Sequence, residues 1–548
     1  MSGIGNKDEP WWKGAVIYQV YPRSFRDTTG DGVGDLQGII KGLPHIASLG
    51  VDAVWLSPFF TSPMKDYGYD VADYCGVDPM FGTLADFDRL IETAHGLGLK
   101  VVIDQVWSHT SDQHDWFTES RESRTSPKAD WYVWADPKPD GSPPNNWQAV
   151  FGGPSWEWDG RRQQYYMHNF LVSQPDLNLH NEEVQDALLE VARFWLDRGV
   201  DGFRLDAINF AMHDRSLADN PPSGVPMEKV TRPFDMQLHT NSMSQPEIPA
   251  FLERVRTELE RAGETFSVAE VVGADAIAEM KAFTEGEARL HSAYNFDFLY
   301  AQSLSPARVK RSLEQWAGAD GEGWPSWAFS NHDAPRAVSR WAAPEDRKQA
   351  ADMLLLLLLS LRGNVFLYQG EELGLPQAHV PFEHLKDPEA IANWPRTLGR
   401  DGARTPIPWK ADANNAGFSS GTPWLPLDPG HAGLSADLQE DDSASSLNIT
   451  RELVRLRHGI SALRHGTQRF IDVSEGMLAY EREVAGDGVL CVFNIEADAA
   501  EWRPEQADQW RVIATEQGAE KAGRPLPSRL ARWSGYWAVR EDRSFPGP

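Results

Sequence analysis

The stretch VDGFRLDAINF (residues 200–210) places Arg204 and Asp206 inside an otherwise apolar run. A buried strand normally avoids unpaired charge, because removing a charge from water costs free energy. The two residues stand at positions i and i+2 of a strand, so their side chains point to the same side. An arginine beside a carboxylate keeps it ionised, which suits a nucleophile. A lone pair would suit a structural salt bridge equally well, so its meaning depends on the other strands.

Short apolar runs recur along the chain and indicate strands that are buried on both faces. They alternate with stretches of helical period, such as residues 184–195, after which Gly199 stands where a helix commonly ends. Repeated βα units with eight strands predict an α/β fold, the (β/α)8 TIM barrel. The predicted strands are residues 16–21, 52–58, 100–106, 202–207, 266–271, 291–298, 327–333 and 363–369.

The predicted strands are unevenly spaced, which indicates further domains. About 95 residues separate the third strand from the fourth, and a stretch rich in Pro and Gly follows the eighth. After about residue 470 the helical period gives way to alternating strands. We predict a catalytic barrel over 1–108 and 180–465 with a long insertion at about 370–448, an inserted subdomain B over 109–179, and a C-terminal antiparallel β-sandwich over 466–548.

The composition limits the partners of the protein. The 548 residues carry a formal net charge of −28, and nucleic acid binding would need a basic surface. The beginning of the chain has no apolar signal segment, and the aliphatic run at 353–359 is too short to span a bilayer. The two cysteines suggest no disulfide framework. We expect a cytoplasmic monomer or homodimer that acts on a small neutral substrate, away from membranes and without an organic cofactor.

Polar and charged residues recur at the carboxyl ends of the predicted strands. In a barrel these ends share one face, and catalysis occurs there. Two carboxylates are required to cleave a glycosidic bond through a covalent intermediate, and one must stay protonated to act as the acid. Nearby carboxylates would raise its pKa. The residues that we expect to converge are Asp104, His109, Arg204, Asp206, Glu270, His332 and Asp333.

Five motifs together resemble those of glycoside hydrolase family 13, the α-amylase family, and within it the oligo-1,6-glucosidase and α-glucosidase group. They are VIDQVWSH (102–109), QPDLN (174–178), GFRLDAINF (202–210), AEVV (269–272) and FSNHD (329–333). The resemblance covers nearly the whole chain. It implies that Asp206 is the nucleophile and that Glu270 is the general acid and then the base. Asp333 would grip the sugar hydroxyls and stabilise the transition state.

The resemblance also implies a sugar-binding set. In DYGYD, Asp66 and Tyr69 match a hydroxyl clamp and a stacking ring, and Arg400 of GRDGARTPIPW matches a sugar-binding arginine. Ser108 stands where the family usually has Asn, and Gln105 stands where an apolar residue is usual. The implied set is Asp66, Tyr69, His109, Phe151, Phe170, Arg204, His332 and Arg400, with plain core packing as the alternative for Phe151 and Phe170.

The glycine-rich stretch DTTGDGVGD (residues 27–35) has the spacing of an EF-hand-like loop. The α-glucosidase group carries a similar loop, usually with Asn at the position of Thr29. We predict a structural Ca²⁺ site, with Mg²⁺ or a chance match in a Gly/Asp turn as the alternatives. Its ligands would be Asp27, Thr29, Asp31, the Val33 carbonyl and Asp35.

In this group the residue after the nucleophile tracks the linkage, with Val accompanying α-1,6 and Ala or Thr accompanying α-1,4. Ala207 therefore predicts cleavage of α-1,4-linked glucose from maltose and short oligosaccharides. The long insertions should close one end of the pocket, which predicts an exo-acting α-glucosidase. The covalent intermediate predicts retention of the α configuration and transfer of glucose to other hydroxyl groups. The alternatives are a sucrose hydrolase or isomaltase of the same family. Sucrose isomerases of the family usually carry an arginine-rich RLDRD-type loop, and this sequence contains no such run. A non-catalytic transporter-associated protein of this fold is the remote alternative, and it would lack the carboxylates and carry a transmembrane helix.

Overall fold

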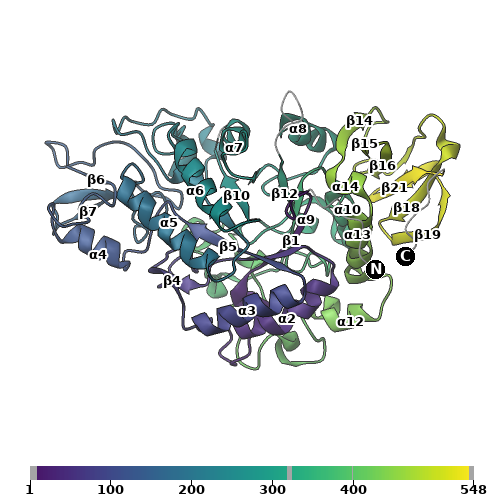
Figure 1. Ribbon diagram of the computed structural model, residues 1–548, viewed down its shortest axis with the longest axis horizontal. Helices are drawn as coiled ribbons and strands as arrows, with labels where there is room; N and C mark the ends of the chain where they lie inside the picture. Colours follow the sequence, from purple (N-terminus) through teal and green to yellow (C-terminus); the bar gives the residue numbers. More distant parts are fainter. Residues whose placement is uncertain (1–8, 274, 317–323, 398, 542–548) are drawn as a thin grey trace.

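The computed structural model describes residues 9–541, except 274, 317–323 and 398. Figure 1 shows three parts along the longest axis of the molecule. A small domain with α4 (Asp115–Glu122), β6 (Trp134–Ala135) and β7 (Trp156–Asp159) lies at one end. The barrel occupies the middle, and an antiparallel sheet drawn in yellow lies at the other end.

The eight predicted strands form one parallel sheet, so the prediction of a TIM barrel is confirmed. Their order is β11-β10-β9-β5-β2-β1-β13-β12. The edge strands β11 and β12 meet through the hydroxyl groups of Ser292 and Ser326, whose oxygens are 2.8 Å apart. The strands are β1 (Val16–Val20), β2 (Ala53–Leu56), β5 (Lys100–Val106), β9 (Gly202–Asp206), β10 (Phe266–Val271), β11 (Ser292–Asn295), β12 (Ser326–Ala328) and β13 (Asn364–Tyr368).

The seventh strand is shorter than its sequence predicts. It ends at Ala328, so His332 and Asp333 lie in the loop that follows. The side-chain oxygen of Asn331 accepts bonds from the backbone N–H groups of Asp333 at 2.9 Å and Ala334 at 2.8 Å. Asn favours such turns because its short side chain can replace a backbone partner. This turn begins after the strand has ended, and it contains His332 and Asp333.

Helices surround the barrel, and their ends follow local chemistry. Helix α5 (Glu182–Leu196) begins where Asn181 accepts a bond from the Glu183 N–H, and Gly199 follows it with a φ of 92°. The other helices are α1 (Pro22–Phe25), α2 (Leu36–Ser48), α3 (Leu84–Gly96), α6 (Ile248–Arg261), α7 (Ala276–Thr284), α8 (Pro306–Trp316), α9 (Ala337–Trp341), α10 (Arg347–Leu358), α11 (Pro388–Asn393), α12 (Ala436–Glu440), α13 (Ser446–Gly459) and α14 (Ser461–His465).

Two further domains complete the chain. Domain B follows β5 and holds α4 and the antiparallel sheet β6-β8-β7, with β8 at Gln164–Met167. A separate two-stranded antiparallel sheet is formed before β5 by β3 (Phe60–Thr61) and β4 (Asp73–Val77). The predicted C-terminal β-sandwich has a six-stranded antiparallel sheet and a two-stranded one. The larger sheet has β14 (Thr467–Ile471), β15 (Met477–Val484), β16 (Asp487–Asn494), β21 (Ser534–Arg540), β18 (Trp510–Thr515) and β19 (Gly518–Pro525), and the smaller has β17 (Ala499–Glu501) and β20 (Arg529–Ala531).

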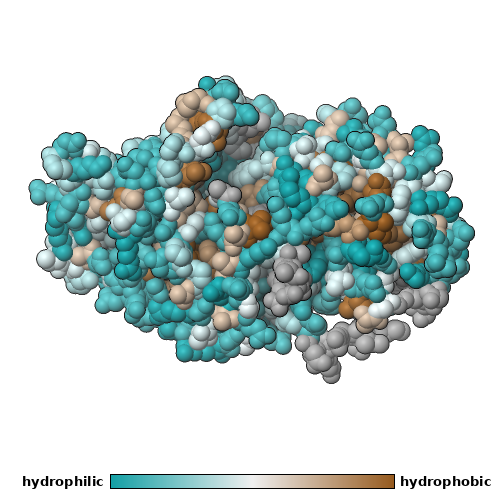
Figure 2. Space-filling model, turned by 90° about the horizontal axis from the view of Figure 1, so that it is seen from above, coloured by the Kyte–Doolittle hydropathy of each residue, from teal (hydrophilic) through white to brown (hydrophobic). Residues whose placement is uncertain are grey.

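The visible surface is mainly polar. Figure 2 shows a face that is largely hydrophilic, with hydrophobic residues in small separate patches. This agrees with the composition, in which 80 acidic residues outnumber 52 basic residues. No helix in the described part of the chain is both long and apolar enough to cross a membrane.

A buried arginine joins the barrel to the helix that precedes the C-terminal sheet. Arg457 of α13 is fully buried and donates to the carbonyl oxygens of Leu359 at 2.6 Å and Gly363 at 2.7 Å, between α10 and β13. It also reaches the carbonyls of Leu361 and Gly14, each at 3.2 Å. Arginine can serve several carbonyls at once because it carries five N–H donors.

Replacing Arg457 by Met should lower the free energy of unfolding by about 3 kcal/mol or more, because buried carbonyl oxygens lose their donors. Urea titration followed by fluorescence measures this change. The exposed neighbour Arg455 on the same helix is the matched control, and Arg455→Met should leave stability nearly unchanged. Equal stability of the two variants would contradict the assigned role.

Candidate active site

Three neighbouring strands bring four charged side chains together at their carboxyl ends. Strand β9 lies between β5 and β10, and Asp104 of β5 is the register partner of Arg204 of β9. Asp206 is the last residue of β9, and Glu270 stands one residue before the end of β10. The parallel register alone therefore places these side chains on one face.

Arg204 is fully buried and its guanidinium serves three carboxylates. Nη1 donates to Asp104 Oδ1 at 3.0 Å and to Asp206 Oδ1. Nη2 donates to Glu270 Oε1, and Nε and Nη2 lie 3.0 and 2.9 Å from the hydroxyl of Tyr294. The planar fork of donors suits arginine to this shared contact. Arg204 thus holds the two proposed catalytic carboxyl groups in one network.

The residue after Asp206 turns the chain sharply. Ala207 has a φ of 40° and a ψ of 41°, in the left-handed region that costs a residue with a side chain about 1–2 kcal/mol. Its N–H points at Glu270 Oε2, 3.2 Å away. The Tyr294 hydroxyl donates to the other oxygen of Glu270 at 2.9 Å. The bend therefore ties the end of β9 to the carboxyl group carried by β10.

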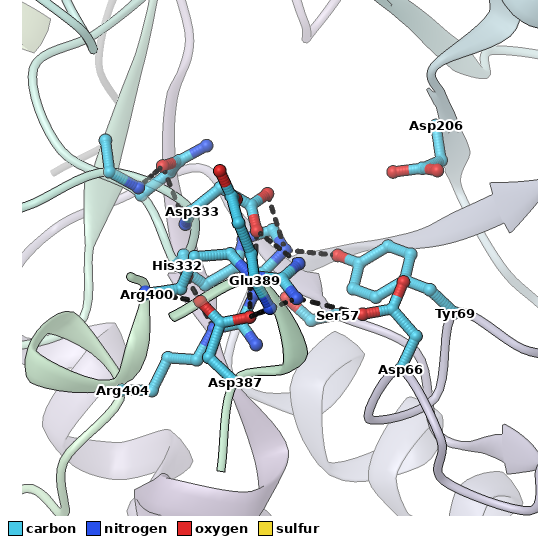
Figure 3. Close-up of polar contacts among 12 residues, drawn as sticks. Ser57, Asp66, Tyr69, Asp206, His332, Asp333, Asp387, Glu389, Arg400 and Arg404 are labelled. Atoms are coloured by element: carbon cyan, nitrogen blue, oxygen red, sulfur yellow. Dashed lines mark hydrogen bonds and ion pairs between the residues drawn. The ribbon is translucent and has the colours of Figure 1, made fainter. Parts of the chain in front are cut away.

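A second charged group lies across an open space from Asp206 in Figure 3. Asp333 Oδ1 accepts a bond from Arg404 Nη2 at 2.7 Å and a longer one from Arg400 Nη1 at 3.4 Å. The second oxygen, Oδ2, lies 3.1 Å from His332 Nε2. Asp333 therefore contacts two arginines and an imidazole, whereas the three carboxyl groups of the first group share one arginine.

Arg400 connects Asp333 with the loop that follows β3. Its Nη2 donates to Asp66 Oδ1 at 3.0 Å and to Asp387 Oδ1 at 2.8 Å. Its guanidinium carbon lies 5.2 Å from the centre of the Phe151 ring. Arg400 therefore holds one oxygen of Asp66 in place, and Gln174 Nε2 donates to the other, Oδ2, at 3.1 Å.

Tyr69 and His109 connect the two groups. The ring of Tyr69 stacks on His332 with centres 5.4 Å apart, and its hydroxyl donates to Asp104 Oδ2 at 3.0 Å. His109 Nε2 lies 3.1 Å from the Tyr69 carbonyl oxygen, and its ring centre lies 5.0 Å from that of Phe170. All the substrate-binding residues expected from the sequence thus lie in one connected set of contacts.

Burial raises the carboxyl pKa values of the first group. The pKa of Asp206 rises to about 7, because burial and the charges of Asp104 and Asp333 outweigh Arg204. Burial together with the charges of Asp206 and Asp333 also raises the pKa of Glu270 to about 7. Arg204 lowers the pKa of Asp206, as the sequence predicts, but it does not offset the effect of burial. One guanidinium is divided among three buried carboxyl groups, so the group retains protons near neutral pH.

Asp333 has the opposite electrostatic environment. Burial alone would raise its pKa, but His332, Arg404 and Arg400 hold the pKa of this carboxyl well below its usual value. Asp333 therefore stays ionised over the pH range in which the first group binds protons. Sites with paired titratable groups commonly assign acid and base roles by such contrasting environments.

Several residues of the site are missed by the sequence reasoning. Arg404 stands four residues after Arg400 in GRDGARTPIPW, so the motif did contain a signal for it. Tyr294 lies in the sixth strand, where it resembles an ordinary core aromatic. Asp387 caps the short helix α11 inside an irregular segment, and no periodic pattern points to it.

The comparison with protein families agrees with this geometry. The family model described as the catalytic domain of alpha amylase matches residues 19–466. The chain belongs to the alpha-amylase family of glycoside hydrolases. The matched region begins within β1 and contains the other seven barrel strands and domain B.

Relatives of this alpha-amylase family enzyme cover most of its length. A probable alpha-glucosidase of Rhizobium meliloti (strain 1021) is 52% identical over 507 residues, which is 91% of this chain and 92% of that protein. An oligo-1,6-glucosidase of Heyndrickxia coagulans is 36% identical over 544 residues, covering 92% and 95%. The enzyme is therefore similar to both α-glucosidases and oligo-1,6-glucosidases.

Solved structures also resemble this alpha-amylase family enzyme. The alpha-glucosyl transfer enzyme XgtA has a TM-score of 0.92 at 51% identity, covering 97% of this chain and 100% of that chain. The trehalulose synthase MutB from Pseudomonas mesoacidophila MX-45 has a TM-score of 0.87 at 32% identity, covering 97% and 99%.

The two departures from the usual family motif have local partners. Ser108 Oγ lies 2.9 Å from Nδ1 of His109, and Gln105 Oε1 accepts a bond from Trp107 Nε1 at 2.9 Å. Asp104 remains in contact with Arg204. The departures therefore leave the positions of Asp104 and His109 intact.

The loop of residues 27–35 is closed by its own hydrogen bonds. Asp27 accepts backbone N–H bonds from Thr29 at 2.8 Å and Gly32 at 2.9 Å, and Asp35 accepts one from Gly38 at 2.6 Å as the N-cap of α2. The described residues contain no group of three His, Cys, Asp or Glu side chains placed to hold a metal ion. In this form the carboxylates of Asp27 and Asp35 accept bonds from backbone N–H groups, and the calcium site stays a prediction.

Calcium bound by Asp27, Thr29, Asp31, Val33 and Asp35 should stabilise the folded enzyme by about 2.7 kcal/mol at a hundred times the dissociation constant. A chelator should therefore lower the melting temperature, and Ca²⁺ should restore it better than Mg²⁺. Asp31→Asn should remove this response, whereas Asp412→Asn at another exposed position should retain it. Elemental analysis without calcium, with one melting temperature under all conditions, would refute the prediction.

Proposed function

We propose that this enzyme is a retaining, exo-acting α-glucosidase that removes α-1,4-linked glucose from maltose and short oligosaccharides and also transfers it. The main support is the pair Asp206 and Glu270, joined by Arg204 and facing an ionised Asp333. Retaining glycosidases use two carboxyl groups close to the same bond. The similarity to α-glucosidases and to a glucosyl transfer enzyme supports small neutral α-glucosides as the substrates.

In the proposed first step, the Asp206 carboxylate attacks C1 of the terminal glucose. The bond between C1 and the leaving oxygen breaks as Glu270 donates its proton to that oxygen. The leaving sugar departs with a neutral hydroxyl group, and an ester bond joins C1 to Asp206. The ionised Asp333 faces the positive charge that develops on the sugar ring and stabilises it.

In the second step, Glu270 acts as a base because it has lost its proton. It removes a proton from water or from a sugar hydroxyl, and that oxygen attacks C1. The ester bond breaks and Asp206 regains its charge. Two inversions at C1 leave the product in the α configuration. Water yields glucose, and a sugar hydroxyl yields a transfer product.

The linkage preference rests on Ala207, whose backbone lies in the left-handed region. A β-branched residue is a rare occupant of this region, because its side chain crowds the backbone. Ala207 packs with Phe210 and Met243 beside the nucleophile, so its size shapes the space next to Asp206. We infer that the small side chain favours an α-1,4-linked partner sugar.

The enzyme should have a higher kcat/KM on maltose than on isomaltose or sucrose, and NMR should show α-glucose as the first product. Ala207→Val should raise the kcat/KM on isomaltose relative to that on maltose. It should also lower the free energy of unfolding by about 1 kcal/mol through backbone strain. Ala207→Gly, which relieves the strain, is the matched control. A wild-type preference for isomaltose would refute the linkage assignment, and release of β-glucose would refute the two-step scheme.

The kcat/KM for maltose should fall as pH rises above about 7, because Glu270 then loses the proton that the leaving oxygen needs. Glu270→Gln should cut the rate on maltose about 10²-fold or more. The loss should be smaller on glucosyl fluoride, whose leaving group needs no proton. Glu258→Gln, on the outer helix α6, should keep the wild-type profile. An unchanged profile in Glu270→Gln would exclude this residue as the acid.

A further inference from the structure

The segment of residues 212–247, here called the covering segment, follows β9 and packs beside Ala207, the residue after Asp206. The side chains of Asp206 and Asp333 are only 11% and 18% exposed. Phe234, within the covering segment, packs in the apolar cluster that contains Ala207. The covering segment therefore lies next to the end of β9, which carries Asp206.

The covering segment is firmly attached to domain B. The N–H of Asn146 donates to Asp219 Oδ1 at 3.0 Å, and Trp147 Nε1 donates to the Ala218 carbonyl at 2.8 Å. Gln237 adds a bond of 2.8 Å to the carbonyl oxygen of Asn146. With several short bonds between them, the covering segment and domain B form one unit.

The contact of the covering segment with the chain after β13 is much weaker. Between the described residues of these two segments, two hydrogen bonds cross. Arg232 Nη1 donates to Glu389 Oε1 at 3.3 Å, and Arg396 Nη1 donates to the Val230 carbonyl at 3.5 Å. Both distances exceed those of a typical N–H···O bond. We call the boundary that these two bonds cross the seam.

Arg232 touches all three parts that meet at the seam. Its Nη1 also donates to the Val150 carbonyl of domain B at 3.2 Å. Its Nε donates to Asp235 of its own segment at 3.3 Å, and its guanidinium lies 5.4 Å from the centre of the Phe234 ring. The side chains of Arg232 and Glu389 are 25% and 21% exposed, so salt can weaken their attraction.

Glu389 belongs to the same neighbourhood as the second charged group of the site. Figure 3 draws it close to Asp333 and Arg400, with Asp206 on the opposite side. Burial raises its pKa, and Arg232 and Arg400 are the cations that oppose this shift, while Asp387 and Asp235 add to it. One side of the seam therefore lies beside Asp333 and Arg400 of the site.

We propose that Arg232 is a positioning residue that closes the seam with Glu389 and so sets how often the glucosyl-enzyme reacts with a sugar hydroxyl rather than water. The proposal rests on the proposed function, because it requires the covalent intermediate. A closed seam excludes water and holds the acceptor hydroxyl near C1. An open seam admits water, while Asp206 and Glu270 keep their own partners. Loss of Arg232 therefore alters the second step more than the first.

The test uses the full chain with p-nitrophenyl α-glucoside as both donor and acceptor. The release of p-nitrophenol measures the first step, and the release of free glucose measures hydrolysis. The difference between the two amounts measures transfer. Arg232→Ala should lower the ratio of transfer to hydrolysis about two- to fivefold, because the free energy of a partly exposed ion pair corresponds to a factor of this size. The rate of p-nitrophenol release should stay within about twofold of wild type. Glu389→Gln should have the same effect, and Arg232→Lys should retain part of the ratio.

Salt gives a readout that a merely structural role would not change. The ratio of transfer to hydrolysis should fall with added NaCl in the wild type. It should stay constant in Arg232→Ala, because this variant lacks the ion pair that salt screens. The matched control is Arg193→Ala, which removes a 3.0 Å pair with Glu258 between α5 and α6, away from the seam. This control should keep the wild-type ratio.

Three outcomes would overturn the proposal. In the first, Arg232→Ala keeps the wild-type ratio of transfer to hydrolysis. In the second, Arg193→Ala lowers this ratio as much as Arg232→Ala does. In the third, salt changes the ratio equally in the wild type and in Arg232→Ala. If Arg232→Ala unfolds, the ratios of Glu389→Gln and Arg232→Lys decide instead. A wild type that releases no p-nitrophenol would refute the proposed function itself, which separates that failure from failure of the seam.

Discussion

The arrangement of the site depends on one buried guanidinium. Arg204 has no exposed surface, and it binds the carboxyl groups of Asp104, Asp206 and Glu270 from three adjacent strands. Buried charges are tolerated only when they are paired and hydrogen-bonded. Without Arg204, three carboxyl groups would face one another in a low-dielectric interior. The parallel register of β5, β9 and β10 is thus coupled to the charge balance of the site.

The sharing of Arg204 also separates the chemical roles of the carboxyl groups. One positive charge divided among three acids leaves protons bound near neutral pH, whereas Asp333 has two arginines and stays ionised. The values near 7 belong to the interacting group rather than to single residues. A substrate placed between the two sides would meet a proton donor on one side and a fixed negative charge on the other.

The sequence was informative where regular structure carries the chemistry. Buried parallel strands are short apolar runs, so all eight were found, and the charges at their ends stood out against that background. Arg404 and Asp387 were missed because they come from irregular chain after β13, where no period marks a position. The raised pKa of Asp206 was not predicted, because a motif shows Arg204 beside it but not the burial or the two further carboxyl groups that share Arg204. The placement of His332 and Asp333 outside β12 depended on a turn formed by Asn331.

Arg457 has a consequence for how the protein is made. Its side chain reaches the carbonyl of Gly14, 443 positions earlier, where the chain is about to enter the first strand. During synthesis the first strand leaves the ribosome long before this donor exists. The first and eighth strands are neighbours, so the barrel cannot close until most of the chain is available. Until then the edge of β1 remains unpaired, and such edges are where partly made chains associate wrongly. Closure of the barrel therefore waits for β13, and the contact of Arg457 with Gly14 forms later still.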